Sequence, residues 1–293
     1  MIETGIFKLR DPFVVAGEDC YYLYGTDVSE SGWEKTSWAC YRSTGKSLSG
    51  KWEKLKTPVY IRPENAEKNL WAPEVHKYNG YYYMFASYFS SATGHRGCSI
   101  LKSDSLEGPF VEITNGHITP KEWDSIDGTF WVDGEGQPWM VFVHEWTSTD
   151  DGIGRMAAAK LSEDLTHFTS EPKELFRADD APWANIQVTD GCFLYKTAAG
   201  KLLMIWSNSY NDEYRVGIAY SKVRVDGEWI QIEKPLFTKE TSGKHDGGHG
   251  MIFEADGKTY LSIHSPNNLS GGLCEEAVFF QVTERDGLLV CDR

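Results

Sequence analysis

Three aspartates stand beside Pro or Gly where an apolar run begins: Asp11 in RDPF, Asp127 in IDGTF and Asp190 in TDGCF. Glu145, in HEW, directly follows another apolar run. Carboxylates that share one site repel each other and shift each other's pKa, so a fold gains nothing by gathering them. Acid–base chemistry on a glycosidic bond does require such a set. These four groups can do that chemistry only if the fold brings them together.

An internal repeat indicates how the fold could do so. Five segments share one pattern, in which an apolar run starts after a small or charged residue, turns at a Gly and returns as a second apolar run. The pattern is typical of β-hairpins. The segments recur at intervals of roughly 60 residues. They span residues 10–26, 71–87, 126–143, 189–207 and 247–265.

Five repeats of about four strands each predict an all-β fold, a five-bladed β-propeller that forms a single domain over residues 1–293. A pair of β-sandwiches is the alternative. In a propeller the first strand of every blade lines a central channel, so the strand starts should converge at one mouth. The starts are Asp11, Glu74, Asp127, Asp190 and His249, and the expected second-strand ends include Thr26, Ser87, Glu145, Ser207 and His264.

Composition limits the partners. The formal net charge is −14, which disfavours nucleic acid and anionic membrane surfaces as partners. The many aromatic residues, 11 of them Trp, suit stacking on a neutral oligosaccharide or polysaccharide. No apolar run reaches the length of a membrane span, and no signal peptide is visible, so we expect a cytoplasmic protein. A sequence trimmed at its start would look the same and would leave a secreted or periplasmic location open.

Six cysteines lack CxxC pairs and zinc-ligand spacing, so we expect free or buried thiols, with one or two disulfides as the alternative. Oligomeric state is left open.

The motifs RDPF, WAPEV, IDGTFWVD and GGHG, in this order, resemble glycoside hydrolase family 43 from residue 7 to about residue 265. The resemblance implies a five-bladed propeller that hydrolyses plant-type pentose polymers or oligosaccharides with inversion. Exo-acting α-L-arabinofuranosidase or β-xylosidase activity is expected, with galactose-containing or endo-linked substrates as alternatives. By the same resemblance, Asp11 is the general base and Asp127 tunes the general acid.

The general acid is where this sequence departs from the family pattern. The family commonly has Glu-Gly-Pro at the start of blade four, and this chain has Asp190-Gly191-Cys192. Three alternatives stay open: Asp190 is the acid, Glu145 is the acid, or the site is inactive as a hydrolase. The last alternative describes a non-catalytic carbohydrate-binding propeller. Phosphorylase and fructosidase variants of the fold are disfavoured, because no basic phosphate cluster and no Asn-Asp-Pro or Glu-Cys-Pro motif occurs.

Further residues are predicted to bind substrate or a cation. The candidates for substrate binding are Trp71, Glu74, Trp146, Arg215 and His264, with Trp131, Trp183 and Trp206 as weaker sugar platforms. His249 in GGHG matches a channel histidine that lies near a cation in the family, so a calcium or sodium ion is expected as a possible but not required cofactor. The loops at 93–96 and 180–190 are expected to wall the pocket.

Overall fold

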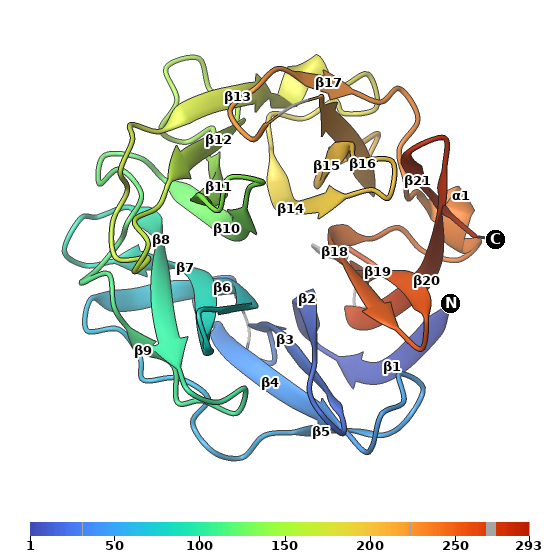
Figure 1. Cartoon of the computed structure of the whole chain (residues 1–293), viewed down its shortest axis with the longest axis horizontal. Helices are drawn as coiled ribbons and strands as arrows, with labels where there is room; N and C mark the ends of the chain where they lie inside the picture. The colour runs from blue at the N-terminus through green and yellow to red at the C-terminus, as the bar shows by residue number, and fades with distance from the viewer. Residues whose placement is uncertain (31, 223, 268–273, 293) are drawn as a thin grey trace.

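The computed structural model describes residues 1–30, 32–222, 224–267 and 274–292. Five antiparallel sheets surround a central channel, which confirms the predicted all-β five-bladed propeller (Figure 1). Apart from the strands, the regular secondary structure of the described residues consists of a 3₁₀ turn (Ala178–Asp180) and the short helix α1 (Lys239–Ser242). No helix in this part of the chain is long and apolar enough to cross a membrane.

The first four blades are continuous in sequence, and each runs from the channel outwards. Blade one consists of β2 (Leu9–Ala16), β3 (Tyr21–Asp27), β4 (Ser37–Ser43) and β5 (Trp52–Lys54), and blade two of β6 (Ala66–Tyr78), β7 (Tyr81–Ser90), β8 (Arg96–Ser103) and β9 (Val111–Glu112). Blade three consists of β10 (Ser125–Val132), β11 (Pro138–His144), β12 (Arg155–Lys160) and β13 (Lys173–Arg177). Blade four consists of β14 (Asp190–Lys196), β15 (Leu202–Tyr210), β16 (Glu213–Ser221) and β17 (Trp229–Gln231).

The fifth blade joins the two ends of the chain. Its inner strands are β18 (Gly248–Ala255), β19 (Lys258–Ser265) and β20 (Glu276–Arg285). Along the outer edge of β20, β1 (Ile2–Phe7) pairs with the first half, with Ile2 opposite Phe279. β21 (Leu288–Cys291) pairs with the second half, with Cys291 opposite Val282. The N-terminal strand therefore closes the ring (Figure 1).

Apolar side chains fill the spaces between blades. Trp183 and Trp206 pack against each other with ring centroids 4.5 Å apart, and they are 3% and 0% exposed. Neither can serve as a sugar platform, so that prediction is wrong for both: their indoles build the interior near blade four. All six cysteines are free, as expected.

The innermost strands share one irregularity near their starts. The pairing register with the second strand shifts there in all five blades. At this bulge one residue takes a positive φ of 43–56°, a conformation that is uncommon for residues other than glycine. These equivalent residues are Asp11, Ala72, Asp127, Gly191 and His249. The repeated bulge lies at the mouth where the predicted site residues meet.

Neighbouring blades hold these bulges in place. The Ala72 N–H donates to Thr26 Oγ1 at 2.8 Å, and the Asp127 N–H donates to Ser87 Oγ at 2.9 Å. In the same way the His249 N–H donates to Ser207 Oγ at 2.9 Å. Each acceptor lies near the end of the second strand of the preceding blade. The predicted second-strand ends thus fasten the strand starts across the blade boundaries.

Candidate active site

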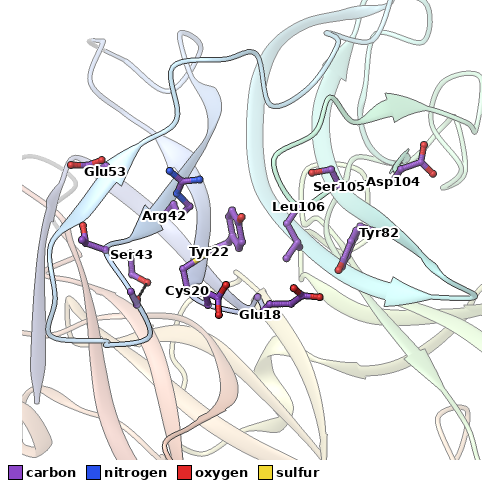
Figure 2. A pocket seen from close by; sticks show the side chains of 14 residues that line it. Glu18, Cys20, Tyr22, Arg42, Ser43, Glu53, Tyr82, Asp104, Ser105 and Leu106 are labelled. Carbon is purple, nitrogen blue, oxygen red and sulfur yellow. Dashed lines mark hydrogen bonds between the residues drawn. The ribbon is translucent and has the colours of Figure 1, made fainter.

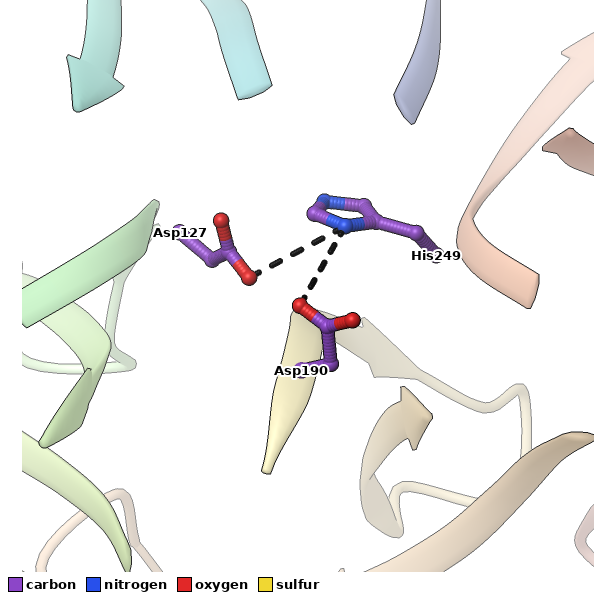
Figure 3. Close-up of side chains that lie close together, drawn as sticks. All are labelled: Asp127, Asp190 and His249. Atoms are coloured by element: carbon purple, nitrogen blue, oxygen red, sulfur yellow. Dashed lines mark ion pairs between the residues drawn. The ribbon is translucent and has the colours of Figure 1, made fainter. Parts of the chain in front are cut away.

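Three carboxylates and one imidazole meet at the channel mouth. Nδ1 of His249 lies 3.2 Å from Oδ1 of Asp11, 3.8 Å from Oδ2 of Asp127 and 3.7 Å from Oδ1 of Asp190. Figure 3 shows Asp127 and Asp190 facing this ring from their separate blades. The structure thus brings together the three aspartates and the histidine that the sequence placed at strand starts.

Asp11 is fixed on several sides. Oδ2 accepts a hydrogen bond from Thr26 Oγ1 at 2.6 Å, while Oδ1 faces His249. Its backbone N–H donates to Nδ1 of His264 at 3.3 Å. Burial, helped by the positive charge of Arg10, holds the pKa of His264 well below its usual range, so this imidazole is neutral and can accept that bond. Asp11 therefore offers one oriented oxygen toward the channel mouth.

Asp127 and Asp190 form a close carboxylate pair. Burial, and then the neighbouring Asp190 carboxylate, raise the pKa of Asp127 well above its ordinary value. Oδ2 of Asp127 also accepts the Gly191 N–H at 2.9 Å, which partly offsets this rise. Beside the Asp190 carboxylate the protonated form of Asp127 is therefore favoured. The Asp190 side chain is 22% exposed and that of Asp127 only 4%, so Asp190 is the member that substrate can reach.

Asp11 and Asp190 face the same imidazole. Nδ1 of His249 lies 3.2 Å from Oδ1 of Asp11 and 3.7 Å from Oδ1 of Asp190, so these two oxygens are at most about 7 Å apart.

Glu145 is buried in an ion pair. Its side chain is 3% exposed, and Oε2 lies 2.5 Å from Nε of Arg96. Arg96 also lies 3.6 Å from Asp124, and the Glu145 N–H donates to the Asp124 carbonyl. Burial raises the pKa of Glu145 to about 7, although Arg96 opposes the rise. Its proton-carrying oxygens are thus less available to a substrate than those of Asp190.

A cavity of about 230 Å³ opens over these groups. Trp71 and Trp146 line it, as predicted, and Ile186 and Val188 from the loop at 180–190 form another wall. From the loop at 93–96, Arg96 reaches the site through Glu145. Apolar and carboxylate groups together are the lining that a sugar requires.

Several lining residues escaped the sequence analysis, among them Arg10, Trp33 and Tyr214. The Trp33 side chain is exposed and meets the Trp71 ring edge-on, with centroids 6.0 Å apart. The Arg10 guanidinium lies over the Trp33 ring, 4.7 Å from its centroid. Trp33 comes from an irregular loop outside the repeat, so no periodic signal marked it. Arg10 directly precedes the predicted base, and this adjacency is a signal that could have found it.

Three residues predicted to contact substrate lie outside this cavity. The register shift in β6 puts Ala72 at the mouth, while Glu74 is buried and bonds to Nε2 of His76 at 2.9 Å. Alternation along β16 turns Arg215 toward Glu213, at 3.2 Å. His264 has no exposed surface and acts on Asp11 instead of on substrate. None of the three lines the cavity.

The groups around His249 include potential ligands for a cation. Asp127, Asp190 and His249 place donor atoms within 4.8 Å of one another. Calcium prefers six or more oxygen ligands, and a cation here would hold both carboxylates ionised, whereas acid catalysis requires a proton on one of them. This donor set fits a resident cation poorly. The calcium or sodium ion expected near His249 stays a prediction, and no catalytic step is routed through it.

A larger cavity of about 710 Å³ lies at the other end of blades one and two (Figure 2). Residues of the β2–β3 turn line this cavity, whereas Asp11 and Thr26 lie at the opposite end of that hairpin. Its Arg42 and Tyr22 both bond to one carboxylate, that of Glu107. No predicted site residue lines it.

The sequence model of Glycosyl hydrolases family 43 matches residues 5–286. The extracellular exo-α-(1→5)-L-arabinofuranosidase ArbA of Cellvibrio japonicus is 24% identical over 288 residues, which cover 88% of this chain and 78% of that protein. The extracellular endo-α-(1→5)-L-arabinanase 1 of Bacillus subtilis is 24% identical over 151 residues, 47% of this chain and 44% of that protein.

Solved structures agree with these matches. The endo-arabinase from Bacteroides thetaiotaomicron has a TM-score of 0.83 and 33% sequence identity, with 98% of each chain covered. A thermostable family-43 glycoside hydrolase has a TM-score of 0.85, with 100% of this chain and 96% of that chain covered. Its identity is 22%, so this second likeness speaks for the fold alone.

Proposed function

Since the chain belongs to glycosyl hydrolases family 43 and is a glycosidase, we propose that it releases terminal α-L-arabinofuranosyl residues from arabinan-type oligosaccharides. Asp11 acts as general base and Asp190 as general acid. The observation that carries the proposal is the meeting of Asp11, Asp127 and Asp190 around His249 at the floor of a Trp-lined cavity.

The choice of arabinose over xylose is supported by the relatives. The curated arabinofuranosidase and arabinanase described above act on α-(1→5)-linked arabinose by their names. The solved structure with 33% identity is an endo-arabinase. These relatives include exo- and endo-acting enzymes, so the mode of action is argued from the site.

The cavity supports exo action. Its volume of about 230 Å³ lies below the roughly 300–1,000 Å³ of pockets that hold drug-sized ligands. Trp33, Trp71 and Ile186 line it, and its volume leaves room for a single terminal sugar above the carboxylates. An endo-acting enzyme requires a groove that runs past the cleaved bond on both sides.

The chemistry follows from the geometry. Asp11 takes a proton from a water molecule as the water oxygen attacks the anomeric carbon. Asp190 gives its proton to the glycosidic oxygen as the bond from the anomeric carbon to that oxygen breaks. The attack comes from the face opposite the leaving group, so the configuration inverts. Asp127 keeps a proton within the Asp127–Asp190 pair, because two ionised carboxylates at this distance repel each other.

Asp190 is preferred to Glu145 as the acid for two reasons. Its side chain is 22% exposed at the cavity, whereas that of Glu145 is 3% exposed. Arg96, 2.5 Å from Oε2 of Glu145, also occupies an oxygen that would have to reach the substrate. In this structure Glu145 behaves as the buried partner of an arginine.

Hydrolysis of linear α-(1→5)-arabino-oligosaccharides tests the proposal, with 4-nitrophenyl α-L-arabinofuranoside and β-D-xyloside alongside. We expect free arabinose as the first product and a loss of about 10²–10⁴-fold in kcat for Asp11→Asn. Glu18→Gln, at the opposite end of the same hairpin, is the matched control and should retain activity. Oligosaccharides as first products would show endo action. Xyloside cleavage alone, or no cleavage, would refute the arabinofuranosidase assignment.

A further inference from the structure

Tyr214 lies against the proposed acid and has no role in the scheme above. It stands on β16, the third strand of the blade whose innermost strand begins with Asp190. Its hydroxyl donates a hydrogen bond to Oδ2 of Asp190 at 2.5 Å. The tyrosine is buried, although it touches the cavity. The hydroxyl is therefore committed to Asp190 and is not a free surface group.

The ring that carries this hydroxyl is held on two sides. It stacks on the imidazole of His264, with centroids 5.6 Å apart and planes 23° apart. On the other side it lies against the backbone of Gly248, where an added Cβ would come within 2.4 Å of Cε1 of Tyr214. Only glycine at position 248 leaves room for the ring. The fifth blade thus fixes a side chain of the fourth.

The bond leaves the two oxygens of Asp190 unequal. Oδ2 accepts from Tyr214, while Oδ1 faces the channel mouth, 3.7 Å from Nδ1 of His249. An oxygen that accepts a hydrogen bond from a neighbouring O–H is a poor place for the carboxyl group's own proton. A proton carried by Asp190 is therefore directed to Oδ1. Aspartate is also one methylene shorter than glutamate, so it reaches the glycosidic oxygen only if it is held in one orientation.

We propose that Tyr214 is a positioning residue, which orients the Asp190 carboxyl group so that its proton lies on Oδ1, toward the leaving-group oxygen. This inference rests on the proposed function, because it concerns the acid of that reaction.

The surroundings permit this role over the working pH range. Burial, and then the Asp190 carboxylate, raise the pKa of Tyr214 well above its ordinary value, so the hydroxyl keeps the proton that it donates. The other groups that face Asp190 are Asp127 from β10, His249 from β18 and, more remotely, Asp11 and Glu145. Tyr214 is the neighbour whose hydroxyl bonds to Oδ2.

The test compares leaving groups. Tyr214→Phe keeps the stacked ring and removes only the hydroxyl. We expect kcat/KM for arabinobiose, a poor leaving group that requires protonation, to fall about 10- to 100-fold. Activity on 4-nitrophenyl α-L-arabinofuranoside should change less than about 3-fold, because nitrophenolate leaves without a proton. Without the donor at Oδ2, the basic limb of the pH profile for arabinobiose should move to higher pH.

The matched control is Tyr195→Phe on β14 of blade four, which removes a hydroxyl that bonds to Glu284 on β20, away from the cavity. It should leave the ratio of the two activities and the pH profile unchanged. Gly248→Ala is a second variant that keeps the hydroxyl but displaces the ring, and it should give the same leaving-group signature as Tyr214→Phe.

The outcomes separate the two proposals. Equal loss on both substrates for Tyr214→Phe, with the pH profile unmoved, would overturn the positioning role alone. An Asp190→Ala variant without leaving-group dependence would remove Asp190 as acid, and this inference with it, while the enzyme assignment would stand. An inactive wild-type protein on the whole arabinoside panel would refute the proposed function together with this inference.

Discussion

At the scale of single residues, the protonation of each carboxyl group in the site depends on its neighbours. Asp127 and Glu145 are both buried, and burial raises the pKa of each. Asp127 faces another carboxylate, whereas Glu145 faces the guanidinium of Arg96. Burial therefore favours a proton on both groups, and at Glu145 the guanidinium opposes this effect.

The stored proton on Glu145 should be visible in stability. The pKa of this carboxyl rises from 4.5 to about 7 on folding, so the folded protein holds a proton that the unfolded chain has released between these pH values. The free energy of unfolding contributed by Glu145 therefore falls as pH rises through this window, by about 3 kcal/mol in all. Glu145→Gln keeps a hydrogen-bond acceptor for Arg96 and removes the titration.

Urea unfolding of both proteins at pH 5 and pH 8 measures this effect. Relative to wild type, Glu145→Gln should gain about 2–3 kcal/mol between the two pH values. The wild-type values must be subtracted because buried histidines make the protein more stable as pH rises, which opposes the effect of Glu145. Burial lowers the pKa of His117, for example, to about 4. A difference that does not change with pH would mean that Arg96 keeps Glu145 ionised throughout.

At the scale of elements, the bulge at the start of each innermost strand sets what reaches the mouth. The same backbone distortion carries Asp11, Asp127 and His249 in three blades but Ala72 and Gly191 in the other two. One position therefore supplies ionisable side chains in some blades and only shape in others. In blade four the acid that we propose, Asp190, is the residue just before the bulge.

Thr26 links two of these bulges. Its Oγ1 donates to Asp11 at 2.6 Å and accepts from the Ala72 N–H at 2.8 Å, and the residue is fully buried. Thr26→Val keeps the shape and removes both bonds. We expect it to cost about 1–3 kcal/mol in unfolding free energy and to lower kcat about 10-fold, because Asp11 loses its orientation.

Thr26→Ser retains the hydroxyl and is the control for that change. Thermal unfolding together with hydrolysis of 4-nitrophenyl α-L-arabinofuranoside would check both effects. Full activity in Thr26→Val would show that His249 and His264 orient Asp11 without help.

Sequence patterns located the site where the repeat is regular. Asp11, Asp127 and Asp190 were found because Pro or Gly follows an acidic residue at these three strand starts. Glu74 and Arg215 lie outside the cavity for a local reason: side chains alternate along a strand, so a bulge or a one-residue shift in register turns a different residue inward. The correct neighbours were Ala72 and Tyr214.

At the scale of the whole molecule, the ring depends on its first strand. Ile6 on β1 is 4% exposed, whereas the adjacent Phe7 is 58% exposed. Ile6→Ala should cost about 2–4 kcal/mol in urea unfolding, since it opens a cavity beneath the closing strand. Phe7→Ala is the matched control from the same strand and should cost less than about 0.5 kcal/mol. Equal costs would show that β1 contributes little to closure.

Ring closure also ties activity to the synthesis of the fifth blade. Thr4 donates to the Ala277 carbonyl across 273 positions of the chain, and the Asp11 N–H donates to His264 across 253. On the ribosome the strand that carries Asp11 emerges well before these partners in the fifth blade, and such long-range pairing slows folding. A product released before the fifth blade would lack both a sealed edge and an oriented base. The nascent chain thus gains its final shape and its chemistry in the same late step.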